Sequence, residues 1–302
     1  MSPVIAAAKA IPNSLKADEL YRYSHDLIRG LIARKIKIIS YANDGTEVER
    51  AVQKRLIQFA DSRSTYKIKH PIPGCANLVI DIAVIDGQLV AMIQDSKHRL
   101  KTDRNNLFTG AKLFALGSHV AMYSYVRDMA FGAESPLYHR DVEKTDRQDD
   151  NASTRVHSAA AMAYLAKHHK DRLGLIIYLF IFGELINAYQ NRKIPHIERI
   201  KMALRARFFI DMWRSFLKAA GYTESRYFIS REFTDILGFL VDGLISLVII
   251  HWDHMDGEIY PLLPWLHSSE TCEHIFGECQ KLVKDFTFLD FLYMIPRLHI
   301  LV

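Results

Sequence analysis

Three acidic side chains stand where carboxylates can do chemistry. Asp44 and Asp95 each lie at the carboxyl end of a short strand-like run, and Glu273 lies early in an amphipathic stretch near the carboxyl end of the chain. Mg²⁺ prefers oxygen ligands, and two such ions about 4 Å apart stabilise both the attacking and the leaving oxygen of a phosphodiester. The acids therefore indicate metal-dependent phosphoryl transfer. The structural alternative is that each acid occupies a turn or caps a helix.

A basic and aromatic stretch, RARFFIDMWRSFLK, is the candidate nucleic-acid surface. Residues 192–218 carry eight basic side chains against two acidic ones. In this interpretation three arginines bind phosphates and Trp213 stacks on a base: Arg205, Arg207 and Arg214. The alternative is an amphipathic helix that buries one apolar face, formed by Phe208, Phe209, Met212 and Phe216.

A histidine pair offers a third kind of chemistry. In the segment HWDHMDG, the side chains of His251, His254 and Asp256 are potential ligands of a hydrolytic metal ion. With fourteen histidines in the chain, such a pair also arises by chance.

The elements that must position the first two acids alternate between helix and strand. Apolar residues recur at helical spacing over 17–34, and the β-branched run 35–41 predicts a strand that leads to Asp44. Thr46 and Glu49 form a capping box that begins another helix.

A hairpin and a helix surround the second acid. The runs 78–85 and 88–93 flank Asp86-Gly87, a dipeptide that favours a type I′ hairpin turn. A helix over 97–116 follows, with Asp95 or Ser96 as its cap. Asp44 and Asp95 are thus both expected at the ends of strands.

The rest of the chain is predicted to be helical. An acidic linker covers 134–151, and helical patterns follow in the ranges 153–168, 171–190, 196–220 and 230–251. The tail, 268–291, is predicted as one helix that carries Glu273.

Composition describes a globular, intracellular protein. The chain has 302 residues, of which 49% are hydrophobic and 24% charged, and its formal net charge is +5. Three cysteines without paired spacing predict neither a disulfide frame nor a zinc site. The apolar runs Leu173–Gly183 and Ile236–Ile250 are shorter than the roughly 20 residues that cross a bilayer. We therefore expect no membrane partner and a nuclear or cytoplasmic location, with no secretion.

Four segments together resemble one family. SSETCEHIFG is similar to the end of P-element-type DDE transposases, more distantly of the hAT superfamily, where the last catalytic acid precedes a Phe by three residues. QDSKHRLKTDRNNL resembles the D-x-x-H-x-x-K-x-x-R-N segment of these proteins, and IKIISYANDGTEVERAVQKRL resembles the strand and loop that hold their second acid. GELINAYQNR is similar to the start of a motif in their helical insertion domain.

The resemblance implies a fold and a set of roles. The fold class would be α/β plus α: an incomplete RNase H-like core over 1–130, a mostly helical insertion domain over 131–266, and a C-terminal helix over 267–302 that returns to the core. Asp44 and Glu273 would be the surviving metal ligands, with Asp95 as a further catalytic acid. Glu270, His98 and Lys101 would be accessory residues. The implied partners are Mg²⁺, DNA, GTP in the insertion domain, and a second copy of the chain.

One departure bears on activity. The resemblance places the first catalytic Asp on a strand well before Asp44, and only sixteen residues precede the helix at 17–34. We therefore expect a transposase-derived protein whose ancestral reaction, metal-dependent DNA strand cleavage and joining, is lost in this truncated form. The alternative is a nucleic-acid-binding or interaction module without catalysis.

Overall fold

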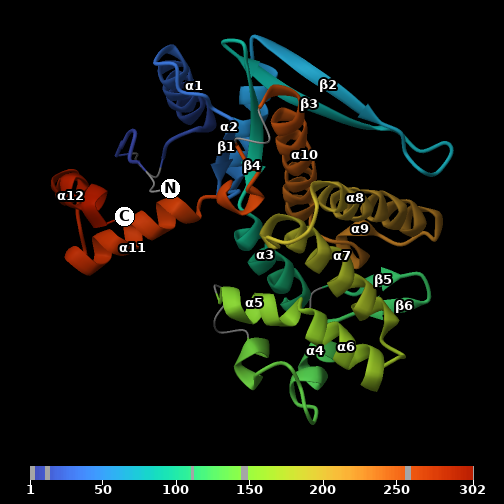
Figure 1. Cartoon of the computed structure of the whole chain (residues 1–302). Helices are drawn as coiled ribbons and strands as arrows, with labels where there is room; N and C mark the ends of the chain where they lie inside the picture. Colours follow the sequence, from blue (N-terminus) through green and yellow to red (C-terminus); the bar gives the residue numbers. More distant parts are fainter. Residues whose placement is uncertain (1–3, 11–13, 110–111, 144–148, 256–259, 302) are drawn as a thin grey trace. The chain divides into compact units, whose positions relative to one another are not determined.

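The computed structural model describes residues 4–10, 14–109, 112–143, 149–255 and 260–301, the side chains of 299–301 excepted (Figure 1). Contacts divide the chain into two units, which we treat separately. The first unit contains Met1–Thr65, Asp81–Asp95 and Leu266–Val302. The second unit contains Tyr66–Ile80 and Ser96–Trp265. This division differs from the ranges predicted from the sequence, because residues 96–130 belong to the helical second unit.

A four-stranded sheet and two helices begin the chain. Their bounds are α1 (Ala17–Ala33), β1 (Ser40–Asn43), α2 (Glu47–Gln58), β2 (Ser62–Ile68), β3 (Leu78–Ile85) and β4 (Gln88–Gln94). The strand order is β1-β4-β3-β2. β1 runs parallel to β4, with Ser40 opposite Ala91 and Asn43 opposite Gln94, whereas β3 and β4 are antiparallel. Parallel strands end at the same side of a sheet, so the residues that follow β1 and β4 are brought together.

Most of these elements form where the local sequence signals predict them. Thr46 accepts a hydrogen bond from the Glu49 amide and the Glu49 side chain bonds back, which confirms the capping box of α2. Asp86 and Gly87 have φ values of 45° and 76°, as a type I′ turn requires. The strand predicted from Lys35 begins five residues later, because Lys35 adopts the left-handed region with φ of 63°. β2 was not predicted, because its sequence SRSTYKI is polar and lacks a clear apolar alternation.

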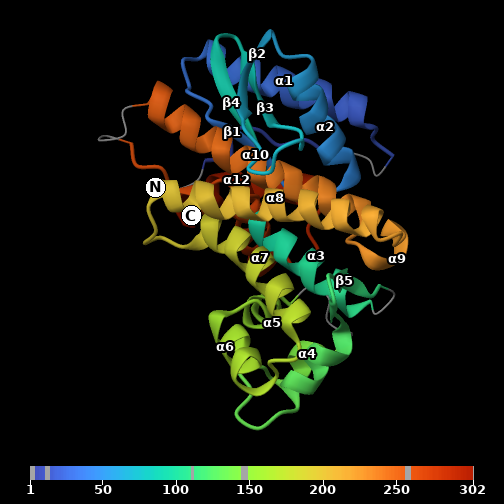
Figure 2. The same cartoon turned by 90° about the vertical axis from the view of Figure 1, so that its right-hand side faces the viewer.

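The second unit is mostly helical. Its elements are α3 (Ser96–Phe108), β5 (Phe114–Leu116), β6 (His119–Ala121), α4 (Tyr123–Ala130), η1 (His139–Val142), α5 (Asp150–Val156), α6 (Ala159–His168), α7 (Leu173–Gln190), α8 (His196–Ala219), α9 (Glu224–Tyr227) and α10 (Arg231–His254). A short 3₁₀ helix, η2 (Pro264–Leu266), spans the point where the chain passes from the second unit to the first. α8 packs against both α7 and α10, as Figure 2 shows. The predicted helix over 97–116 ends at Phe108, and the predicted helix over 153–168 is broken between α5 and α6.

The face that α8 buries differs from the predicted one. Trp213 is only 3% exposed, and its indole nitrogen donates a hydrogen bond to the Ala115 carbonyl at 2.6 Å. Met212 and Phe216 are exposed, at 42% and 37%. Trp213 is therefore a core residue, and the proposal that it stacks on a nucleic-acid base is wrong.

Among the described residues, two helices are long and apolar enough to cross a membrane by length and composition, namely α7 with 18 residues and α10 with 24, both in the second unit. Both are longer than the apolar runs on which the sequence expectation relied. Half of the apolar window of α7 and 67% of that of α10 are buried inside the structure. The core helices of a globular unit show the same combination, so the finding is weak evidence for a membrane.

The predicted single tail helix is two helices. α11 (Glu270–Leu282) and α12 (Phe288–Leu301) pack on each other around a small core of Cys279, Phe291, Met294 and Leu298. Phe276, an apolar residue of α11, is 50% exposed. The fold as a whole is mixed α/β and mostly helical.

Candidate functional site

Asp44 and Asp95 meet at one serine. The hydroxyl of Ser269 lies within hydrogen-bond distance of Asp44 Oδ1 and, at 3.0 Å, of Asp95 Oδ2. The Ser269 amide also donates to Asp95 Oδ2 at 3.1 Å. All three residues belong to the first unit. The two acids predicted at strand ends therefore do come together, and the serine between them belongs to no motif that the sequence analysis identified.

The strand ends hold both acids in place through a buried amide network. Asp95 N–H donates to the Asn43 carbonyl at 2.9 Å, which extends the β1–β4 ladder by one residue. The side-chain amide of Gln94 donates hydrogen bonds through Nε2 to Asn43 Oδ1, at 2.9 Å, and to Gln53 Oε1. Gly45, with φ of 89°, leaves room for Gln94, because a Cβ there would lie 2.0 Å from Gln94 Oε1. Asp95 is 3% exposed, and Asp44 is half-buried.

The third predicted acid lies one turn into α11. Glu273 is exposed, four residues after Ser269, and Glu270 begins the helix with its amide bonded to Ser268 Oγ at 3.3 Å. Cys272 is exposed as a residue, yet partial burial of its thiol raises the pKa of that group, and the nearby carboxylates of Asp44 and Glu273 raise it further. Both acids therefore lie close enough to the same thiol to act on it electrostatically. Within the described ranges, no group of three or more His, Cys, Asp or Glu side chains is placed to hold a metal ion.

A histidine that the sequence did not single out lies beside this site. His267 Nδ1 is 2.7 Å from the hydroxyl of Ser40, the first residue of β1. Burial lowers the pKa of His267 to about 4. The ring is therefore neutral at pH 7, and the contact joins the start of β1 to the residues that lead into α11.

The accessory residues His98 and Lys101 are on α3, in the second unit. Lys101 forms an ion pair with Asp150 at 3.3 Å. Arg104, from the same predicted motif, is buried and donates to the Asp141 carbonyl at 2.8 Å. Arg104 therefore stabilises the fold of this unit.

The three arginines of the predicted nucleic-acid surface do not share one face of α8. Arg207 and Arg214 are two helical turns apart on one side, and Arg205 is about 200° away from Arg207 around the helix axis. Each is paired with an acid: Arg205 with Glu184, Arg207 with Asp211 at 3.3 Å, and Arg214 with Glu224 at 3.3 Å.

The histidine pair lies at the end of α10. His251 Nε2 faces the Tyr260 carbonyl at 2.5 Å, which occupies one of the two ring nitrogens that could bind a metal. His254 is exposed, and Asp256 lies outside the described residues.

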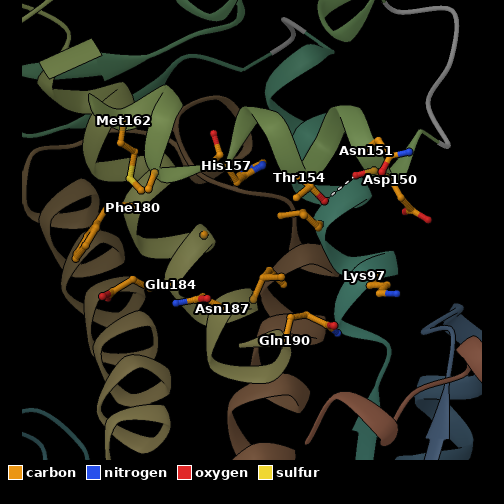
Figure 3. A pocket seen from close by; sticks show the side chains of 15 residues that line it. Lys97, Asp150, Asn151, Thr154, His157, Met162, Phe180, Glu184, Asn187 and Gln190 are labelled. Atoms are coloured by element: carbon orange, nitrogen blue, oxygen red, sulfur yellow. Dashed lines mark hydrogen bonds between the residues drawn. The ribbon is translucent and has the colours of Figure 1, made fainter. Parts of the chain in front are cut away.

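The second unit contains a cavity of about 830 Å³. Figure 3 shows side chains from α3, α5, α6 and α7 around it, and the polar ones include Lys97, Asp150, Glu184 and Asn187. His157 forms part of the wall and contacts two other buried polar residues, Asp103 and Ser153. Its Nε2 is 3.2 Å from Asp103 Oδ2, while its Nδ1 faces the Ser153 carbonyl at 2.9 Å. No motif in the sequence pointed to this cluster, because its members come from separate helices.

Of the comparisons with known proteins, the one with solved structures found a similarity. No known family description and no curated protein matches the sequence. A solved structure described as a Drosophila P element transposase strand transfer complex is similar, with a TM-score of 0.65 at 12% sequence identity. The similarity covers 93% of this chain and 63% of that chain. The chain therefore shares a fold with that transposase and spans less than two thirds of its length.

Proposed function

We propose that this chain is a transposase-derived protein that binds DNA, and that its ancestral reaction was metal-dependent cleavage and joining of DNA strands. The observation that carries the proposal is the likeness of fold over 93% of the chain. The order of the four family-like segments and the meeting of Asp44 and Asp95 at one serine agree with it.

The acidic site suits a hard cation such as Mg²⁺, because its carboxylate and hydroxyl oxygens are the donors that this ion prefers. Asp44 and Glu273 would hold the ion, with Asp95 beside them. When bound, Mg²⁺ supplies Lewis acidity toward a phosphoryl oxygen. The contacts bring two carboxylates to one hydroxyl, whereas two-ion cleavage needs more fixed ligands. We therefore propose that the chain binds DNA without cutting it.

Arg207 and Arg214 are the phosphate contacts that we propose. Their side chains lie two turns apart on α8 and are 31% and 40% exposed. Exposed ion pairs contribute only about 0–1 kcal/mol, so a phosphate can replace Asp211 or Glu224 as the partner. Arg205 was predicted as a third contact, but it points to another side of the helix and provides an internal comparison.

The experiment measures DNA affinity against salt concentration. We expect a linear log-log dependence, with a slope of about −0.9 for each phosphate that the protein neutralises. The double variant Arg207→Gln, Arg214→Gln should make the slope less negative by roughly 2. Arg205→Gln is the matched control and should leave it unchanged. A flat salt response of the unmodified protein would contradict DNA binding, and Mg²⁺-dependent nicking in the same samples would contradict the proposed loss of cleavage.

The cavity of the second unit is the place where we propose that GTP binds, as the family resemblance implies. Pockets of roughly 300–1,000 Å³ with a few polar groups take ligands of this size. Glu184 and Asn187 offer partners for a base, and Lys97 offers a cation for phosphate. Titration with a fluorescent GTP analogue tests this, with Asn187→Leu expected to weaken binding. Asn106→Leu on α3 does not alter the cavity lining and should bind as the unmodified chain does.

Two further expectations belong to the same proposal. A DNA-binding role implies a nuclear location, which imaging of the tagged protein tests. Assembly of two copies is tested by light scattering with and without DNA.

A further inference from the structure

Helix α12 is apolar on two opposite sides. Its inward side chains, Phe291, Met294 and Leu298, form the small core with α11. On the outward side, Leu289 is 59% exposed and Tyr293 is 77% exposed. A surface helix normally has one apolar stripe, whereas a helix that is apolar all round is normally buried. The outward side of α12 therefore has the composition of a surface that binds a partner.

The outward residues form one continuous stripe, which we call the α12 stripe: Phe288, Leu289, Leu292, Tyr293 and Pro296. Their spacing of one, three, one and three residues keeps them within about 140° of the helix circumference. If a large apolar side chain has about 200 Å² of surface, the first four leave roughly 400 Å² in water. Apolar patches of about 300–600 Å² on a protein surface are often functional.

Two charged residues at the edge of the stripe make it complementary to itself. Asp290 and Arg297 are the two Asp, Glu, Lys or Arg residues in the sequence of α12. They are seven residues apart, so they lie only about 20° apart around the helix axis, at the same edge of the stripe. When two copies of α12 pack antiparallel around a twofold axis, residues at equal distances from that axis face each other. An axis just after Tyr293 therefore places Asp290 of each copy beside Arg297 of the other.

The same register also centres the apolar residues. The midpoint of 288–296 lies within two residues of that axis, so the exposed Tyr293 meets its counterpart in the other copy. A parallel arrangement would place like charges beside each other, which disfavours it. Two stripes supply roughly 800 Å² of apolar surface, and homodimer interfaces are about 65% apolar, so the whole interface would bury about 1,200 Å². That area is the lower end of the range for specific interfaces.

We propose that the α12 stripe is an interface between two copies of this chain, which pack α12 against α12 in antiparallel orientation with reciprocal ion pairs between Asp290 and Arg297. The inference deepens the assembly of two copies and rests on that part of the proposed function, and it requires neither DNA nor a metal ion. The apolar residues supply the affinity. The charged pairs select the register, because exposed ion pairs add little to affinity.

Sedimentation equilibrium of the whole chain is the first test. We expect a dimer with a Kd in the micromolar range, because the interface is small. Tyr293→Ser should weaken association by at least about tenfold, since aromatic residues near the centre of an interface carry much of its binding energy. Trp252→Ser is the matched control. That side chain is 72% exposed but lies in the second unit, so the variant should associate as the unmodified chain does.

A charge exchange tests the register. Homodimers of Asp290→Lys or of Arg297→Glu would place like charges beside each other, and we expect each variant alone to associate about tenfold more weakly. An equal mixture of the two variants should recover the affinity, because every facing pair in the heterodimer is then opposite in sign. Asp290 also accepts hydrogen bonds from Thr287 at the start of α12. The mixture contains the same substitution, so loss of these bonds cannot produce the recovery.

Three results would overturn the proposal. A chain that stays monomeric well above micromolar concentration has no such interface, and binding of this monomer to phosphatidylserine vesicles would assign the stripe to a membrane surface. A dimer that Tyr293→Ser leaves intact uses another surface, so the assembly of two copies would stand and this inference would fail. A mixture without recovery excludes the antiparallel register. The salt dependence of DNA affinity tests the proposed function separately from all three.

Discussion

At the level of single residues, His267, which contacts Ser40, makes the stability of the first unit depend on pH. Burial lowers the pKa of His267 to about 4, below its ordinary value of about 6.5. Between these two values the unfolded chain binds a proton that the folded chain does not. Stability is therefore full above pH 6.5 and falls as the pH drops toward 4.

We expect His267→Gln to remove most of this pH dependence. A full shift of this size corresponds to a loss on the order of 3 kcal/mol between pH 7 and pH 4, because one pKa unit equals about 1.4 kcal/mol. Urea unfolding at pH 7, 5.5 and 4 measures it. His274→Gln, at an exposed position on α11, should keep the slope of the unmodified protein. The same slope in both variants would contradict the assignment.

The acids and their partners differ in how far sequence could predict them. Asp44 and Asp95 follow apolar runs, so their place at strand ends follows from local pattern. Ser269 and His267 are 225 and 227 residues away from their partners Asp44 and Ser40. No local pattern encodes a hydrogen bond across such a separation, and both residues were missed for that reason.

At the level of elements, α7 shows how closely a helix can approach a strand. A Cβ on Gly174 would lie 2.5 Å from the carbonyl oxygen of Val120, in β6, and 2.8 Å from its nitrogen. Backbone atoms of a strand cannot move aside as the end of a side chain can. The second residue of α7 therefore has to be glycine for the helix to pack on β6.

We expect Gly174→Ala to destabilise the second unit by about 1–3 kcal/mol, the range for overpacking a core. Chemical denaturation measures the change. Gly238→Ala on α10 is the matched control, because its Cβ would meet only the end of Arg207 at 3.6 Å. Alanine is a better helix former by about 1 kcal/mol, so this control should be neutral or stabilising. Equal effects of the two substitutions would refute the close approach.

Most helices were predictable because their apolar residues recur clearly at helical spacing and because each helix ends near polar residues. The tail was not, since its apolar residues continue at helical spacing through the break between Leu282 and Phe288. Periodicity also could not tell which residues of α8 are buried. Small residues, Ala203 and Ala206, share the buried face with Trp213, while larger apolar residues stay partly exposed.

At the level of the whole molecule, the two units have separate spectroscopic signals. All three tryptophans, Trp213, Trp252 and Trp265, belong to the second unit. Helices in both units contribute to circular dichroism. Fluorescence should therefore follow the second unit alone, which allows the stability of each unit to be measured in the intact chain.

We expect Leu56→Ala, in the core of the first unit, to lower the midpoint of the circular-dichroism transition and leave the fluorescence midpoint in place. Deletion of such a buried side chain costs about 2–5 kcal/mol. Leu179→Ala, equally buried in the second unit, should shift the fluorescence midpoint. If Leu56→Ala moves both midpoints together, the units unfold as one cooperative structure.

The division into units was only partly open to sequence reasoning. The composition change beyond residue 130 suggested a helical insertion, but α3 and β5–β6 already pack with α7. Packing of this kind depends on which faces meet, and a change of composition along the chain does not encode that.

The return of the chain to the first unit has a consequence for its synthesis. Ser269 follows Asp95 by 174 residues, so at about 5–20 residues per second the ribosome makes it roughly 10–35 seconds later. During that interval the nascent chain carries two acids without the serine that separates them, while the second unit is already being finished. The acidic site can therefore be assembled only after nearly all of the second unit has been synthesised.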